Sequence, residues 1–264
     1  MALRLAAVEY GAGQGGDAPV AVLHGLFGSG RNWATAARRL AAHRRVVTLD
    51  LRNHGSSPWA DAMDYQALAE DVIATLRTLG PEQWALIGHS MGGKAAMVAA
   101  LSSPDFVERL VVVDIAPVLY RTHHHGHVRA MRGLDLSRIK RRGEADAALA
   151  CAVPDAAERS FLLQNLVFSE TGEPRWRLNL AAIEAGMSDL VGWPALPAVA
   201  AYPRPALFVA GGRSDYVRPQ QEPDIRGFFP NAQIAYIPEA GHWLHAERPQ
   251  AFLDVIEPFL AAGG

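Results

Sequence analysis

One serine in this chain stands in a setting that could make it a nucleophile. Residues 88–92 read Gly-His-Ser-Met-Gly, with the apolar run Trp84–Ile87 before them and the helix-forming run Lys94–Leu101 after them. A Gly-x-Ser-x-Gly between a strand and a helix is the pattern of a nucleophile elbow, in which the flanking residues must be small because the turn is tight. Such a turn strains the serine backbone and points the helix N-terminus at the reacting centre. We therefore predict that Ser90 is a catalytic nucleophile.

A serine hydroxyl needs a base that removes its proton as it attacks. Where this elbow occurs, an acid and then a histidine follow the serine along the chain. The candidate base is His242, since the sequence Ala-Gly-His-Trp at 240–243 follows the last strand-like run. His89 lies inside the elbow and cannot fold back onto its neighbour, so it is a weaker candidate for the base. We expect His89 to line the substrate pocket. We expect His245 to begin the final helical region.

Two aspartates could orient the imidazole of that histidine. Asp215 follows the strand-like run Ala206–Ala210, which is the usual position for the acid, and Asp114 ends an earlier strand-like run. One of the two must stabilise the imidazolium that forms during catalysis. The alternative role for each is to cap a loop. The residues themselves leave the choice open.

The negative charge that develops on an attacked carbonyl needs two backbone N–H donors. One is expected from Met91, directly after the serine, and the other from the loop His-Gly-Leu-Phe-Gly-Ser at residues 24–29, where Leu26 is the candidate donor. We expect Phe27 of this loop to line the pocket. His24 and His54 lie in glycine-flanked turns, where a structural hydrogen bond is the commoner role.

Four histidines, His123, His124, His125 and His127, form a cluster that could suggest a metal site. No carboxylate or cysteine stands beside them at a ligand spacing. We therefore expect solvated histidines or histidines at the rim of a pocket, with no metal and no cofactor.

These residues must be positioned by a sheet with helices on both faces, because strand-like and helical runs alternate along the chain. A first strand is expected within residues 1–10, and helices are expected at Asp64–Leu79 and Ala246–Leu260. The remaining predicted strands are Pro19–His24, Arg45–Leu51, Gln83–Ile87, Arg109–Asp114, Ala206–Ala210 and Gln233–Ile237.

The alternation fails between residues 116 and 205. We expect no strand there, but helical segments at Glu144–Ala152 and Ala156–Val167. Ninety residues are too many for a loop in a compact domain. The segment is therefore predicted to be a helical cap, inserted into a core made of residues 1–115 and 206–264, which excludes water and shapes the pocket.

Composition is that of an ordinary soluble enzyme. The 264 residues carry 25 Lys and Arg against 27 Asp and Glu, so no nucleic-acid-binding surface is implied. The only cysteine is Cys151, which fits a reducing compartment. No signal peptide or membrane-spanning run is apparent, so we expect a cytoplasmic protein that acts without a membrane.

Five motifs in order resemble one family of small α/β-hydrolases, the YbfF-type esterases, which themselves resemble a mitochondrial relative. They are residues 24–29, 52–55 (Arg-Asn-His-Gly), 88–94, 114–117 (Asp-Ile-Ala-Pro) and 241–243 (Gly-His-Trp). The resemblance implies an α/β-hydrolase fold and hydrolysis of short-to-medium acyl esters and thioesters. It also implies that Asp114 is the acid and that Trp243 lines the pocket. The chain departs from the family pattern by carrying Asp215 as well.

The function expected from these residues is that of a serine carboxylesterase acting on small acyl esters or thioesters through an acyl-enzyme. A serine at the elbow argues against dehalogenase and epoxide-hydrolase chemistry, which use a carboxylate there. Alternatives within the fold are a C–C bond hydrolase and a lipase. Another class is a ligand receptor that keeps the hydrolase shell without turnover, but it predicts a broken triad, which is not seen.

Overall fold

The computed structural model describes residues 1–11, 18–80, 83–121, 124–197 and 200–262. Its strands are β1 (Ala6–Tyr10), β2 (Val20–Leu23), β3 (Val46–Asp50), β4 (Trp84–His89), β5 (Val107–Val113), β6 (Leu166–Phe168), β7 (Pro174–Trp176), β8 (Ala206–Gly211) and β9 (Ala232–Ile237). Its helices are α1 (Ala34–Leu40), α2 (Tyr65–Leu79), α3 (Met91–Ser102), α4 (His124–Arg132), α5 (Arg142–Leu149), α6 (Ala156–Leu163), α7 (Leu180–Ala185), α8 (Met187–Val191), α9 (Glu222–Phe228), α10 (Leu244–Glu247) and α11 (Pro249–Ala261). Short 3-10 turns lie at Gly30–Trp33, Leu136–Arg138 and Pro219–Gln221.

Seven strands form one sheet in the order β1-β3-β2-β4-β5-β8-β9. The strand β1 runs antiparallel to β3, and every other pairing in this sheet is parallel. The predicted fold class, a mostly parallel sheet with helices, is confirmed. Each of the six core strands expected after β1 is present, and its ends differ from the prediction by no more than two residues.

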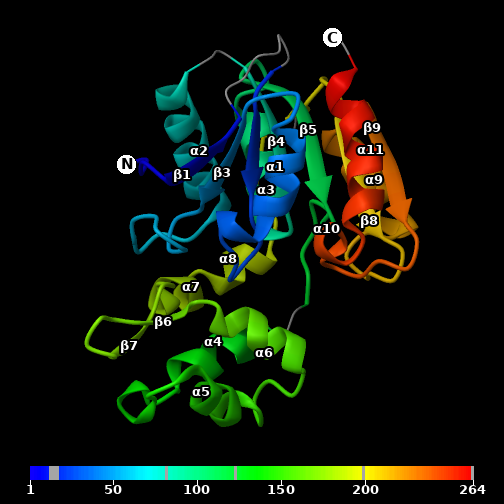
Figure 1. The fold of residues 1–264 in the computed structure, drawn as a ribbon. Helices are drawn as coiled ribbons and strands as arrows, with labels where there is room; N and C mark the ends of the chain where they lie inside the picture. The colour runs from blue at the N-terminus through cyan, green and yellow to red at the C-terminus, as the bar shows by residue number, and fades with distance from the viewer. Residues whose placement is uncertain (12–17, 81–82, 122–123, 198–199, 263–264) are drawn as a thin grey trace.

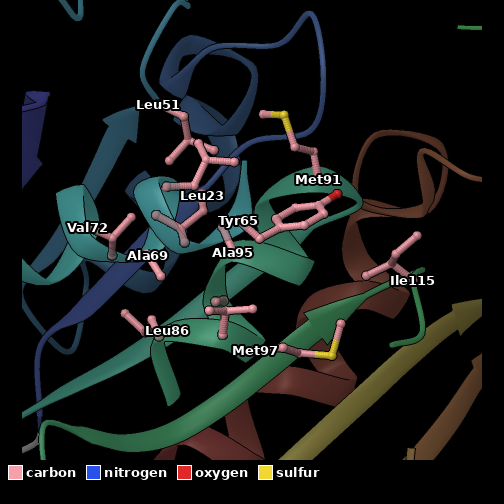
Figure 2. Close-up of a cluster of buried hydrophobic side chains, with 14 of the residues drawn as sticks. Leu23, Leu51, Tyr65, Ala69, Val72, Leu86, Met91, Ala95, Met97 and Ile115 are labelled. Carbon is pink, nitrogen blue, oxygen red and sulfur yellow. The ribbon is translucent and has the colours of Figure 1, made fainter. Parts of the chain in front are cut away.

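Alternate residues of the strands pack on opposite faces of the sheet, because successive side chains of a strand point to opposite sides. In β4, Trp84 and Leu86 join a cluster with α2 and α3, whereas Ala85 and Ile87 join a second cluster with α1 and α11. Figure 2 shows part of the first cluster, in which side chains of α2 and α3 meet those of the sheet. The central strands are therefore covered on both faces, and both sets of side chains are apolar.

Most of the segment between β5 and β8 lies past one end of the sheet, and Figure 1 shows α4 to α7 grouped there, below the strands. Among its described residues, none joins the seven-stranded sheet. The expectation that it holds no strand was wrong, because β6 and β7 pair as a small antiparallel hairpin. Three residues per strand are too few to produce a readable alternation. The helix expected at Ala156–Val167 ends earlier, at Leu163, because the chain turns there and enters β6 at Leu166.

The C-terminal helix also differs from the prediction of one helix at Ala246–Leu260. It begins earlier, as α10 at Leu244, and is interrupted at Arg248 before α11. Pro249 lacks a backbone N–H and its ring fixes φ, so it ends one helix and starts the next. Among the described residues, no helix is long and apolar enough to cross a membrane.

Candidate active site

The serine of the elbow lies between the end of β4 and the start of α3. Ser90 has φ 52° and ψ −118°, a left-handed conformation that is strained for a residue with a Cβ. A Cβ on Gly92 would come within 2.5 Å of the His24 carbonyl oxygen, so only glycine fits there. The Ser90 N–H donates to the Val113 carbonyl at 3.0 Å. The elbow is thus held by packing against β2 and by a hydrogen bond to β5.

The imidazole of His242 contacts a buried carboxylate. His242 Nδ1 lies 2.7 Å from Asp114 Oδ2, and the side chain of Asp114 is fully buried. Asp114 accepts two further hydrogen bonds, from the Gly211 N–H at 3.0 Å and from the Ser214 hydroxyl. The ring of Tyr216 stacks on the His242 ring with 4.0 Å between centroids. Because Nδ1 donates to the carboxylate, Nε2 is the nitrogen left to accept a proton.

A residue of the elbow, His89, also holds the loop of His242 by a hydrogen bond. His89 Nε2 donates to the carbonyl of His242 at 2.9 Å, and burial lowers the pKa of His89 well below its ordinary value. His89 therefore stays neutral and serves as a backbone anchor. His245 lies in α10, as expected, and its ring stacks on Trp33 with 4.1 Å between centroids.

The second candidate acid lies away from the histidine. The Asp215 side chain is 81% exposed and forms an ion pair with Arg218. The structure thus brings Asp114, and not Asp215, to His242. Sequence reasoning missed Ser214 and Tyr216, which contact the pair from the loop after β8; their types carry no motif that could have identified them.

The loop at residues 24–29 is fixed by two buried histidines. His24 Nε2 accepts from the Leu51 N–H at 2.9 Å, and His54 Nε2 accepts from the Phe27 N–H at 3.2 Å. Burial lowers the pKa of His24 to about 4 and that of His54 to about 3, so both rings are neutral acceptors at neutral pH. The Gly28 N–H donates to the Gly25 carbonyl. The Ser29 N–H donates to Asn32 Oδ1 at 2.8 Å, so three amides of the loop are already engaged within the fold.

Two cavities share Ser90, Leu26 and His124 in their linings. The first, the open cavity, has a volume of about 70 Å³ and is lined by His242 and by the predicted pocket residues Phe27, His89 and Trp243. Phe161 of α6 packs near Trp243, with 5.6 Å between ring centroids. This part of the wall comes from the inserted segment, and sequence reasoning did not identify Phe161 as a pocket residue.

The second, the inner cavity, has a volume of about 30 Å³. It is lined by mainly apolar side chains, including Tyr65, Met91, Ile115 and Met187. Figure 2 shows Tyr65 and Met91 close together at this end of the buried cluster. A ligand attached to Ser90 could therefore extend in two directions, into a larger cavity and into a smaller one.

The histidine cluster contributes to the wall of the open cavity. His124 and His127, on α4, line it, and their ring centroids lie 6.1 and 6.4 Å from that of Phe27. His127 Nε2 lies 3.5 Å from Glu158 Oε2. His125 is exposed, and His123 lies outside the described residues. Within the described ranges, no group of three or more side chains could hold a metal ion.

A buried lysine joins the elbow helix to two parts of the inserted segment. Lys94 Nζ donates to the carbonyls of Val118, at 2.8 Å, and Val191, at 3.2 Å, and also to that of Gly192. Burial lowers the pKa of Lys94 to about 7. The Lys94 side chain thus ties α3 to the segment that follows β5 and to the end of α8.

Comparison with known proteins identifies a family for this fold. The alpha/beta hydrolase fold family matches residues 18–249. The sn-1-specific diacylglycerol lipase ABHD11 of Mus musculus is 42% identical over 250 residues, which cover 92% of this chain and 80% of the relative. The esterase YbfF of Escherichia coli strain K12 is 37% identical over 248 residues and is covered to 94%, as is this chain. The solved structure of a marine microorganism esterase superposes with a TM-score of 0.92 at 37% identity, covering 98% of this chain and all of that one.

Proposed function

The chain belongs to the alpha/beta hydrolase family, and we propose that within it this protein is a serine carboxylesterase acting on small acyl esters or thioesters. Its relatives include an esterase and a diacylglycerol lipase by name, which supports ester hydrolysis as the general reaction. The observation that carries the proposal is the strained Ser90 in the same cavity as a histidine whose Nδ1 is bound to a buried aspartate.

The proposed reaction begins with attack of Ser90 Oγ on the acyl carbon. His242 Nε2 takes the serine proton, and the Asp114 carboxylate holds the ring in the required tautomer and stabilises the imidazolium. His242 then gives the proton to the leaving alcohol or thiol, which leaves an acyl-enzyme. Water repeats the cycle, with His242 again as base, and frees the acid. No metal or cofactor takes part in these steps.

The oxyanion is proposed to bind the amides of Met91 and Leu26. Met91 is the first residue of α3, so its N–H has no acceptor within that helix. In the other loop the Phe27 and Gly28 amides are engaged, and Leu26 is the residue that lines both cavities with Ser90. Removing one such donor typically costs a factor of about 10² to 10³ in rate.

We assign the acyl group to the inner cavity and the alcohol to the open cavity. The inner cavity, at about 30 Å³, has room for two or three water-sized groups, which fits a short acyl chain. The open cavity is roofed by residues of α4 and α6. In this proposal residues 116–205 act as a cap inserted into the core of residues 1–115 and 206–264.

A reactive probe tests the nucleophile directly. The wild-type protein should be labelled by a fluorophosphonate and should give a burst of p-nitrophenol from p-nitrophenyl butyrate. Ser90→Ala should lose both signals at an unchanged melting temperature, because only the hydroxyl is removed. Undiminished labelling of the alanine variant would show that the nucleophile is another residue. A wild-type protein with neither burst nor turnover would favour a non-catalytic receptor.

A further inference from the structure

A larger polar cleft lies next to the open cavity, between the core and the inserted segment. Its volume is about 540 Å³, and Phe27 and Asn32 line both hollows. Asn32 Nδ2 donates to Gln164 Oε1 at 3.0 Å, and Asn165 Nδ2 donates to the Phe27 carbonyl at 2.8 Å. The two hollows therefore share Phe27 and Asn32 in their walls. A substrate that extended from the open cavity into the cleft would pass these two residues.

Three arginines, Arg31, Arg142 and Arg177, line this cleft, which we call the arginine cleft. Other arginines form ion pairs, such as Arg45 with Glu9. Among the ion pairs of the described residues, none includes an arginine of the cleft. The guanidinium of Arg142 is held by a hydrogen bond from Nη2 to the Leu166 carbonyl at 2.8 Å.

One carboxylate, that of Asp50, also lines the cleft, and it is occupied by the backbone. It accepts from the Gly30 N–H at 2.7 Å and from the Ser56 N–H at 2.8 Å. Three guanidinium groups therefore face one hydrogen-bonded carboxylate, so the cleft is positive in a chain whose net charge is −2. Guanidinium groups present paired N–H donors that match phosphate oxygens.

We propose that the arginine cleft binds a phosphate carried by the leaving alcohol, a few bonds from the ester oxygen. This inference rests on the proposed esterase function and deepens it. In this arrangement the acyl chain occupies the inner cavity, the alcohol the open cavity, and the phosphate the cleft beyond Phe27 and Asn32. The serine hydroxyls that line the cleft supply further donors.

A matched pair of substrates tests the proposal. For the wild-type protein, kcat/KM should be about tenfold higher for 1-butyrylglycerol 3-phosphate than for 1-butyrylglycerol, because charge-assisted hydrogen bonds exceed the ordinary ones they replace. The preference should fall at high salt, since the site is open to solvent. Equal kcat/KM for the two esters would overturn the proposal. A protein that hydrolyses neither these esters nor p-nitrophenyl butyrate would overturn the esterase function itself.

Variants locate the preference in the cleft. Arg177→Gln should cut the ratio of the two kcat/KM values by about tenfold. Arg31→Gln, at an exposed side chain, should cut it by about threefold and cannot disturb the fold through a lost hydrogen bond. Arg175→Gln is the matched control, because Arg175 is exposed on β7 and does not line the cleft. A ratio that falls equally in all three variants would contradict the assignment.

A second pair distinguishes a nearby phosphate from a remote one. Butyryl-coenzyme A and butyryl-N-acetylcysteamine share the thioester, but the phosphates of the former lie at the end of a long arm. We expect similar kcat/KM values for this pair. A preference confined to the coenzyme A thioester would overturn a phosphate site a few bonds from the ester.

Discussion

The acid that orients His242 can be tested by two aspartate-to-asparagine changes of equal size. In Asp114→Asn the side chain keeps its shape but loses its charge, and it can present an N–H where Nδ1 of His242 now donates. The ring is then free to adopt the tautomer in which Nε2 carries the proton and cannot accept one from Ser90. A serine protease triad loses about 10⁴ in kcat on this change, which corresponds to about 5 kcal/mol of transition-state stabilisation. We expect a loss of the same order.

The matched variant, Asp215→Asn, removes only an exposed ion pair. Its side chain is 81% exposed and paired with Arg218, and such pairs contribute no more than about 1 kcal/mol. We therefore expect kcat to stay within about tenfold of the wild-type value. Both variants are assayed with p-nitrophenyl butyrate, and their melting temperatures control for misfolding. A collapse of kcat in Asp215→Asn at unchanged melting temperature would refute the reasoning. Two tolerated single changes with an inactive double variant would mean that both aspartates serve the histidine.

Three further predictions concern the base, the acyl cavity and acid stability. His242→Gln should abolish turnover, whereas His245→Gln should retain most of it, and the reverse in a kcat assay would show that the base is misassigned. Met187→Ala should move the preferred chain length of p-nitrophenyl esters upward, because it enlarges the inner cavity that Met187 lines; an unchanged chain-length profile in a folded variant would place the acyl group elsewhere. The pKa values of His24 and His54 are lowered by burial to about 4 and about 3, so below pH 6.5 the unfolded chain binds protons that the folded chain does not. Stability should therefore fall by about 2 kcal/mol per histidine between pH 6.5 and pH 5, as measured by urea unfolding, and equal unfolding free energies at pH 7 and pH 5 would contradict this.

Local features of the site could be predicted because neighbouring residues determine them. The elbow requires a strand, a tight turn with small residues and a helix in immediate succession. The residue types at 84–101 predict all three. The alternation of strands and helices is likewise a local signal, and the predicted fold class is confirmed. The boundaries of helices were less predictable, as the break at Pro249 shows.

Features that depend on distant contacts could not be predicted in the same way. The inserted segment was expected from the failed alternation, but its hairpin of β6 and β7 depends on pairing between two short strands. The wall that Phe161 and Glu158 give to the open cavity also depends on how α6 packs over the core. The periodicity of a helix predicts which of its own residues are buried, but not which residues of neighbouring elements they will contact.

The sequence by itself determined the nucleophile candidate, the histidine candidate and the sheet that carries them, because each rests on a short pattern of residue types. Only the tertiary structure decided which aspartate meets His242. Both Asp114 and Asp215 follow strands, and either position could serve. Asp114 turns inward at the end of β5 with φ 51°, where Gly211 and Ser214 bind its carboxylate, whereas Asp215 points to solvent. That difference comes from the packing of β5 against β8, about a hundred residues apart in the chain, which no local pattern encodes.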